Sequence, residues 1–236
     1  MPPPPTGATI VSSSGASCSI SSAIVKPDIK VIGVETTSFS AMHQLLAGEP
    51  VTAGGDTIAE GIAVRDIGKM PLAIAKALLD QVLTVDEVAI ERAIALFLEV
   101  EKTVAEGAGA AGLAALLSHP QHFVGRKVGL VLSGGNIDTR LLASVLLRGL
   151  VRDGRIVQLR LMIGDAPGQL ARVATIIGKL GGNIVEVQHQ RLFGVVAKAT
   201  ELDVTVETRD RAHVRELIAA LEADGFKVHL LESPEV

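Results

Sequence analysis

The ten residues 129–138, GLVLSGGNID, combine groups that could bind a ligand. Their apolar run stops at Ser133 and Gly134, and Asp138 then begins a helical pattern. Ligands of open α/β sheets bind at the carboxyl ends of the strands, and Ser133 lies at such an end with a hydroxyl that can donate a hydrogen bond. The alternative is a simple strand-to-helix turn, in which the glycines relieve φ strain and Ser133 bonds only to backbone.

Two further segments place an acid or a glycine where a ligand could lie. Glu106, in AEGAGA, opens a glycine- and alanine-rich helix, and Gly61 lies in the loop sequence AEGIAV. Glu106 can face a ligand, or it can simply complement the helix dipole. Gly61 can likewise be an ordinary loop glycine.

The segment 164–173, GDAPGQLARV, puts Asp165, Pro167 and Gly168 in a turn directly before a helix. The free N–H groups of a helix N-terminus attract anions such as a carboxylate. The same residues also make a good turn and helix start that binds nothing. Both interpretations stay open at this point.

The composition argues against several classes of function. The 236 residues carry a net charge of −4 with acids and bases interspersed, so nucleic acid is not an expected partner. No apolar stretch reaches the roughly 20 residues that span a bilayer, and no membrane association is expected. The single cysteine, Cys18, argues against a disulfide framework and favours the cytoplasm. The scattered histidines share no metal-binding motif, and no metal site is predicted from His43, His119, His189, His213 and His229.

The first part of the chain alternates strands with helices. Strands are predicted at 26–35 and 126–135, helices at 38–48, 71–79, 85–104, 107–119 and 138–152, and a glycine-rich loop at 51–64. Strands that alternate with long helices indicate an α/β domain with a mostly parallel sheet.

The pattern changes around Asp153 and Gly154. The remaining residues read as strand, helix, strand, strand, helix, strand, and the strands alternate polar with apolar residues as in a sheet with one covered face. That order is the β-α-β-β-α-β plan of a ferredoxin-like domain. The expected segments are an aberrant or disordered N-terminus (1–25), an α/β domain (26–153) and the ferredoxin-like domain (154–236).

Four motifs, KPDIKVIGVE, DTIAEGIAV, EGAGAAGLAAL and VLSGGNID, resemble in order and spacing the C-terminal half of the catalytic domain of threonine ammonia-lyases (threonine dehydratases). The tail resembles an ACT domain. Serine dehydratases and serine racemases carry similar motifs. The resemblance implies a tryptophan-synthase-β-like parallel-sheet domain that is partial here, followed by an ACT regulatory domain.

The resembling family uses pyridoxal phosphate (PLP), bound to a lysine as a Schiff base. By resemblance, Ser133 with Gly134 would face the pyridine nitrogen of the cofactor, Gly61 would lie beside its ring, and Glu106 would face it. The implied reaction converts threonine to 2-oxobutanoate and ammonia, with serine as an alternative substrate. Glu35 matches an acid that helps to bind a cation in the racemases, but Phe39 and Ala41 supply no further oxygen ligands, so no metal is predicted.

The resemblance to ACT domains implies an amino-acid effector, isoleucine or valine, and association into a homo-oligomer. Asp165, Pro167 and Gly168 match one wall of the effector site, and Asn183 and Ile184 match the other. Isoleucine is favoured because it is the end product of the biosynthetic branch of the resembling family.

The chain departs from the family pattern near its start. No lysine has the family's serine-lysine context, and no glycine tetrad precedes KPDIK to hold the cofactor phosphate. A shifted reading frame or a truncated gene is the hypothesis for residues 1–25. The chain alone is therefore expected to be inactive, and the alternative function is a non-catalytic module for amino-acid binding or oligomerisation.

Overall fold

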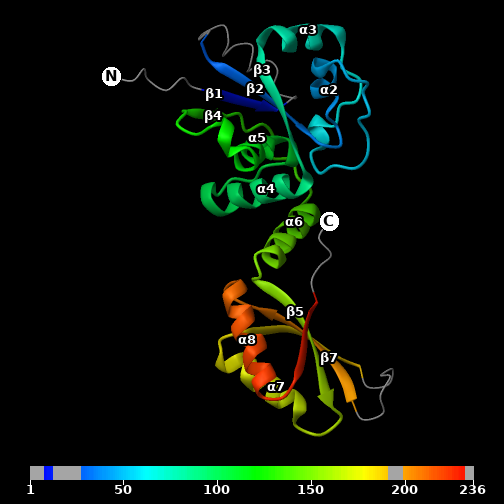
Figure 1. The fold of residues 1–236 in the computed structure, drawn as a ribbon, viewed down its shortest axis with the longest axis vertical. Coiled ribbons are helices and arrows are strands. Elements are labelled where there is room, and N and C mark those ends of the chain that lie inside the picture. The colour runs from blue at the N-terminus through cyan, green and yellow to red at the C-terminus, as the bar shows by residue number, and fades with distance from the viewer. Residues whose placement is uncertain (1–7, 13–27, 191–198, 232–236) are drawn as a thin grey trace. The chain divides into compact units, whose positions relative to one another are not determined.

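The computed structural model describes residues 8–12, 28–190 and 199–231. The chain divides into two compact units, unit 1 (Met1–Val145) and unit 2 (Leu146–Val236), and the division falls within one helix, α6 (Thr139–Arg152). In the described ranges, every helix is either too short or too polar to span a membrane. Figure 1 shows a sheet with helices in each unit.

Unit 1 contains a four-stranded sheet in the order β3-β2-β1-β4, and all its strands are parallel. The strands are β1 (Ala8–Ser12), β2 (Lys30–Thr36), β3 (Leu79–Val85) and β4 (Val128–Leu130). The parallel sheet and two of its strands, β2 and β4, agree with the sequence prediction. β3 was not predicted, because its short mixed sequence LDQVLTV lies directly between two stretches with helical periodicity.

The expectation that residues 1–25 are aberrant or disordered is wrong for β1. This strand lies between β2 and β4, and Ile10 is in register with Ile32 on one side and with Leu130 on the other. Its sequence ATIVS contains β-branched residues that favour a strand. The other residues of that segment, on which the reading-frame hypothesis depends, lie outside the described residues.

The helices of unit 1 follow the predicted pattern. They are α2 (Ala41–Ala47), α3 (Lys69–Leu78), α4 (Glu87–Glu101), α5 (Gly107–Ser118) and the start of α6, and the predicted loop at 51–64 contains only the short 3-10 turn η2 (Glu60–Ile62). The glycines and alanines of α5 are buried against α4 and against the sheet. A helix with such small side chains lets neighbouring backbone approach closely.

Glu35, at the end of β2, is a buried carboxylate that binds the start of α2. It is only 2% exposed, and its two oxygens accept the N–H groups of Met42 and His43 at 2.9 and 2.8 Å. Burial raises the pKa of Glu35 above its ordinary value, although the backbone hydrogen bonds from His43 and Met42 oppose this shift. In the part of the chain that the structure describes, no cluster of metal-binding side chains surrounds it.

The raised pKa of Glu35 predicts a pH-dependent stability. A carboxyl whose pKa is higher in the folded state binds more protons there than in the unfolded state, so its contribution is full below the ordinary glutamate pKa and is lost as pH rises through the folded value. We expect Glu35→Gln to flatten this fall in the free energy of unfolding. The exposed control Glu49→Gln should leave the pH dependence of the free energy of unfolding unchanged. Urea unfolding can be followed by far-ultraviolet circular dichroism, which suits a chain without Trp or Tyr. Equal pH profiles for wild type and Glu35→Gln would contradict the prediction.

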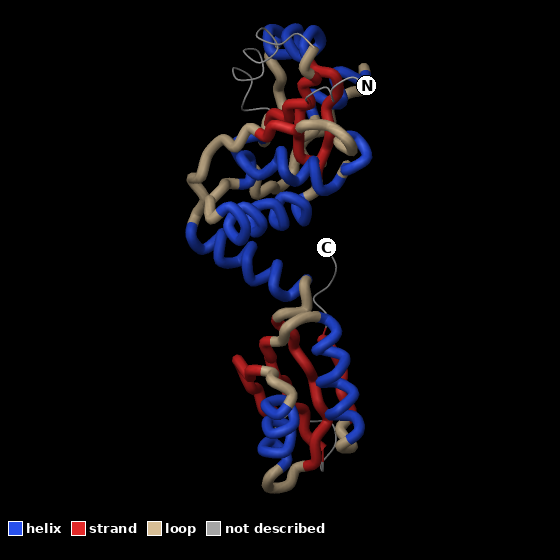
Figure 2. Tube along the Cα trace, turned by 90° about the vertical axis from the view of Figure 1, so that its left-hand side faces the viewer, coloured by secondary structure: helices blue, strands red, loops and turns tan. Residues whose placement is uncertain are grey.

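Unit 2 is an antiparallel sheet with the strand order β6-β7-β5-β8. Its strands β5 (Ile156–Gly164), β6 (Asn183–Gln190), β7 (Ala199–Glu207) and β8 (Lys227–Leu231) alternate with helices α7 (Gln169–Lys179) and α8 (Arg211–Ala223) in the predicted order (Figure 2). With the strands numbered within the unit, the order is 4-1-3-2, that of a ferredoxin-like sheet. The expected fold of the second half is therefore confirmed.

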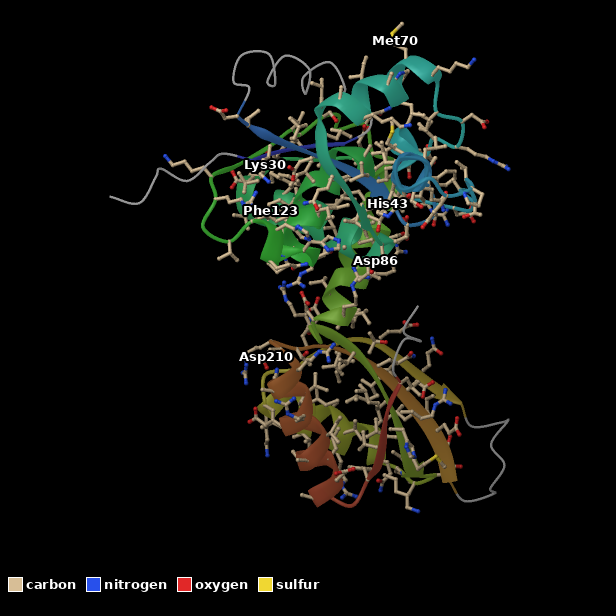
Figure 3. All side chains as sticks on the ribbon, turned by 45° about the horizontal axis from the view of Figure 1, so that its top comes forward. Lys30, His43, Met70, Asp86, Phe123 and Asp210 are labelled. Atoms are coloured by element: carbon tan, nitrogen blue, oxygen red, sulfur yellow. The ribbon has the colours of Figure 1, made fainter. Side chains whose placement is uncertain are left out.

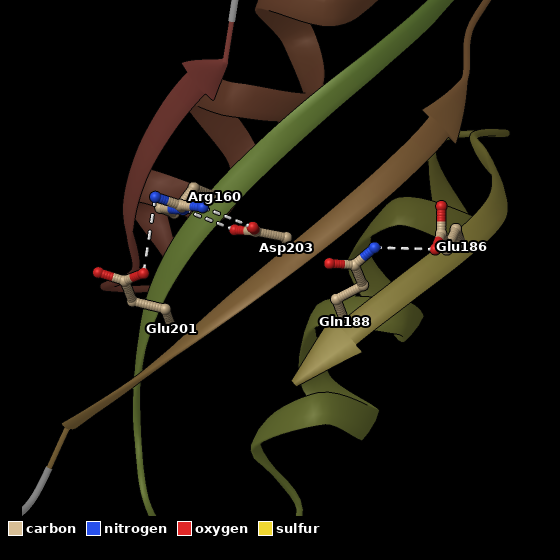
Figure 4. A network of polar contacts seen from close by, with 5 residues as sticks. All are labelled: Arg160, Glu186, Gln188, Glu201 and Asp203. Atoms are coloured by element: carbon tan, nitrogen blue, oxygen red, sulfur yellow. Dashed lines mark hydrogen bonds and ion pairs between the residues drawn. The ribbon is translucent and has the colours of Figure 1, made fainter. Parts of the chain in front are cut away.

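The core of unit 2 lies between one face of the sheet and its two helices. Alternate residues of β5 and β7, such as Leu159, Leu161 and Val204, are fully buried and belong to the same cluster as Val173 of α7 and Leu217 of α8. The other face is polar. There Arg160 donates two hydrogen bonds of 2.7 Å to Asp203, and Gln188 donates to Glu186 (Figure 4).

Candidate functional site

The hydroxyl of Ser133 is buried just beyond β4. Its Oγ has no hydrogen-bond partner among the described residues. A buried polar group left unpaired costs about 1–3 kcal/mol, so such a group often marks the place where a ligand or a water molecule completes the bond. Ser133 therefore offers an open hydrogen-bonding position at the carboxyl end of a parallel strand.

The carboxylate of Glu106 lies against the turn that follows Ser133. The backbone N–H of Glu106 donates to the carbonyl oxygen of Gly134 at 3.3 Å. Gly134 has a φ of 81°, and a Cβ atom at this position would collide with the Glu106 carboxylate. Glu106 occupies the N-cap position of α5, yet its side chain makes no capping hydrogen bond. The carboxylate thus faces the turn rather than serving its own helix.

Gly61 completes this arrangement from the turn η2. A Cβ atom on Gly61 would lie 3.6 Å from Oε1 of Glu106 and 3.0 Å from Cβ of Ala108. The structure therefore brings together four residues from three distant segments: Gly61, Glu106, Ser133 and Gly134. These four residues form what we call the Ser133 wall.

Two glycines of α5 allow the segments of the wall to meet. A Cβ atom on Gly107 would collide with the carbonyl group of Ile58, and one on Gly109 would collide with the carbonyl oxygen of Ser133. Only glycine permits such a close approach of backbone to backbone. The glycines of α5 are therefore required for this close packing.

Lysines whose contacts are defined are engaged at other places in unit 1. Lys30, at the start of β2, has its Nζ 3.2 Å from Asp80 (Figure 3). Lys102, after α4, donates to the carbonyl oxygen of Glu99 at 2.7 Å.

The candidate effector turn of unit 2 is exposed. Asp165, Pro167 and Gly168 lie between β5 and α7, and Gly168, with a φ of 85°, is the N-cap residue of α7. Asn183 begins β6 and donates from Nδ2 to Glu207 at 2.8 Å, while Ile184 packs against the core.

The structure does not bring these two groups together within one copy of the chain. Asn183 is in register with Glu207, which in turn is in register with Ile156 at the start of β5. The Asp165 turn follows the opposite end of β5, eight residues beyond Ile156 at about 3.3 Å per residue. Within one copy the two groups therefore lie at opposite ends of the sheet, because β5 and β6 run in the same direction, and the expected site with two walls stays a prediction.

The family comparisons agree with this division of the chain. Residues 7–134 match the model of the pyridoxal-phosphate dependent enzymes, and residues 153–224 match an ACT domain. The chain belongs to the pyridoxal-phosphate dependent enzyme family. The family match begins at residue 7 and so includes β1, in agreement with the place of this strand in the sheet.

Individual relatives are similar to this chain over most of its length. An L-threonine ammonia-lyase of Thermotoga maritima is 37% identical over 221 residues, which are 92% of this chain and 54% of the relative. One of Geobacter sulfurreducens is 40% identical over 212 residues, 87% of this chain and 52% of the relative. The chain therefore spans about half the length of the curated relatives it matches.

Solved structures support the fold of the PLP-dependent part. A threonine deaminase of T.th. aligns with a TM-score of 0.52 and 31% identity, over 56% of this chain and 51% of that chain. A maize serine racemase aligns with a TM-score of 0.52 and 27% identity, over 64% of this chain and 49% of that chain. The expected fold class, a parallel-sheet PLP-dependent domain followed by an ACT domain, is confirmed.

The Ser133 wall fits the pyridoxal ring in one respect, because the buried, unpaired hydroxyl of Ser133 can donate a hydrogen bond to the ring nitrogen. The sequence analysis missed one residue of this region, Glu87, whose carboxylate accepts the N–H of Ile58. An acid in the first turn of a helix normally indicates only a favourable dipole interaction, so no local signal points to this contact.

The Gly134 geometry predicts a specific loss of stability. Gly134→Ala should lower the free energy of unfolding by about 1–3 kcal/mol, because alanine is strained at positive φ and its Cβ would displace Glu106. Gly129→Ala is the matched control: it has no atoms within 4 Å of its added Cβ, and its effect should stay within about 1 kcal/mol. Urea unfolding measures both, and equal losses would show that the contact with Glu106 is unimportant.

Proposed function

We propose that this chain provides the Ser133 wall of a PLP-dependent ammonia-lyase, together with an ACT domain that regulates it. The buried, unpaired hydroxyl of Ser133 beside Glu106 is the observation that carries the proposal. PLP, when bound, supplies an electron sink for negative charge that develops on the substrate α-carbon. Threonine is the proposed substrate and 2-oxobutanoate with ammonia the products, because two relatives that are 37% and 40% identical are named L-threonine ammonia-lyases. Serine is the competing substrate.

The residues of the wall have distinct proposed roles. Ser133 donates a hydrogen bond to the ring nitrogen without protonating it, since a hydroxyl is a far weaker acid than a carboxyl group. Gly134 lets the Glu106 carboxylate pack directly against the turn after Ser133, and Gly61 lies beside the same carboxylate and Ala108. A neutral partner at the ring nitrogen keeps the electron sink mild, which suits elimination of the β-hydroxyl as water.

A non-catalytic role in amino-acid binding or oligomerisation is the second candidate function. It is favoured by unit 2, whose described residues form all six elements of the ferredoxin-like fold with their own core. PLP binding by the wild type distinguishes the two candidates, because only the first requires it.

PLP titration tests the proposed role of Ser133. The wild type should bind PLP, and Ser133→Ala should weaken binding about three- to tenfold, the effect of one neutral hydrogen bond. Ser118→Ala, at the exposed end of α5, serves as the control and should bind like wild type. Equal affinities for wild type and Ser133→Ala would refute the role of the hydroxyl.

The same samples test catalysis. We expect no 2-oxobutanoate from threonine above a PLP-only blank, because covalent catalysis needs a lysine amine and no lysine of this chain has the family's serine-lysine context. Turnover that Ser133→Ala abolishes would overturn this expectation.

We further propose that the ACT domain binds a small aliphatic amino acid, isoleucine or valine, between two copies of the chain. Asp165 to Gly168 of one copy would meet the ligand carboxylate and ammonium, and Asn183 and Ile184 of the second copy would form the other wall. If two β6 strands pair antiparallel at their free edges, the start of each lies at the sheet end where the other copy has its Asp165 turn. Val185 and Val187, which are 56% and 39% exposed on β6, support such an interface.

Mixing variants tests the shared site. Isoleucine in hundredfold excess over its Kd should stabilise the wild type by about 2.7 kcal/mol, seen as a shift in Tm. Asp165→Ala and Asn183→Ala should each lose the shift, whereas a refolded mixture of the two should regain part of it, because mixed dimers contain one intact site. Gly168→Leu is a further variant, and its side chain should prevent the ligand from binding at the Asp165 turn, so the Tm shift should again be lost. Failure of the mixture to respond would place the ligand within one copy, and no response of the wild type to any amino acid would leave the domain as an assembly module.

A further inference from the structure

Glu87, in the first turn of α4, does not act as a helix cap. Its neighbour Asp86 (Figure 3) caps the helix by accepting the N–H of Ala89 at 2.7 Å. The carboxylate of Glu87 is directed elsewhere: Oε2 accepts the backbone N–H of Ile58 at 2.9 Å. The other oxygen, Oε1, is buried and has no hydrogen-bond partner among the described residues. Burying an unpaired carboxylate oxygen costs free energy. Because Asp86 already caps the helix, the hydrogen bond to Ile58 is the interaction that Glu87 contributes.

Ile58 begins the segment that carries Gly61. The segment is folded by short-range hydrogen bonds, from the N–H of Ala59 to Oγ1 of Thr57 at 3.1 Å and from the N–H of Ile62 to the carbonyl oxygen of Ala59 at 3.0 Å. The side chains of Ala59 and Ile62 are 0% and 1% exposed in the core of unit 1. The segment is therefore a compact turn that is packed into the core by these two side chains and attached to α4 by the N–H of Ile58.

The two polar groups of Ile58 connect this turn to two different helices. Its N–H binds Glu87 of α4, and its carbonyl group lies where a Cβ on Gly107 of α5 would collide with it. Glu106, the residue before Gly107, lies 3.6 Å from the Cβ position of Gly61. A displacement of Ile58 would consequently change the spacing between Gly61 and Glu106.

We propose that Glu87 is a positioning residue for the Ser133 wall, which it supports by holding Ile58 between α4 and α5. Its carboxylate sets the distance of Gly61 from Glu106 without itself facing the ligand. The expected effect on PLP binding rests on the proposed function, whereas the expected effect on the turn does not. Hydrogen exchange measures the effect on the turn and PLP titration measures the effect on cofactor binding, so the two effects can be separated.

Hydrogen exchange of the intact chain tests the attachment directly. Glu87→Ala should raise exchange about tenfold in peptides covering residues 57–64, relative to those covering β2 and β3. Asp86→Ala is the matched control, since it removes a helix cap one residue away but leaves the bond to Ile58. Glu87→Gln keeps an amide oxygen that can accept the N–H of Ile58 and should restore slow exchange.

PLP titration of the same variants tests the consequence for the wall. Glu87→Ala should weaken PLP binding about tenfold, while Glu87→Gln and Asp86→Ala stay within twofold of wild type. The proposal is overturned if Glu87→Ala and Asp86→Ala loosen residues 57–64 equally, or if Glu87→Gln exchanges as fast as Glu87→Ala. If the wild type binds no PLP, the proposed function fails, and the exchange comparison still decides whether Glu87 positions the turn.

Discussion

The close approach of α5 to its neighbours is the constraint on which unit 1 depends. Backbone of the Ile58 turn meets this helix at Gly107, and backbone after β4 meets it at Gly109. Neither contact tolerates a side chain, so the start of α5 acts as a common reference for two loops that are far apart in sequence. A residue on either loop is thus placed relative to Glu106 by backbone contacts, which are stiffer than contacts between mobile side chains.

In unit 2 the fold is complete, but the candidate site residues lie far apart. Its core is continuous and its six elements follow the expected order, yet strand direction separates Asp165 from Asn183 by most of the length of a strand. A complete fold therefore does not imply a complete site. In unit 1 the candidate residues converge on one place, whereas in unit 2 they are distributed to the two ends of the sheet.

Sequence reasoning recovered features set by local periodicity and missed those set by distant pairing. The helix α4 and the elements of unit 2 are visible in the spacing of apolar residues and in glycines that end helices. The assignment of β1 and β3 depends on partners elsewhere in the sheet, which no local pattern reveals. Ser133 and Glu106 were found because their motifs are distinctive, but the link from Glu87 to Ile58 exists only in three dimensions. Asn183 lies at the start of β6, and only the register reveals which end of the sheet that is.

The position of β1 has a consequence for synthesis on the ribosome. Ala8 pairs with Lys30 on one side, but its partner on the other side is Val128. Translation at about 5–20 residues per second leaves on the order of ten seconds between the synthesis of β1 and that of β4. Throughout that interval one hydrogen-bonding edge of β1 has no partner strand, and an open strand edge is a site of aggregation. That edge is therefore completed only after residue 130 has left the ribosome.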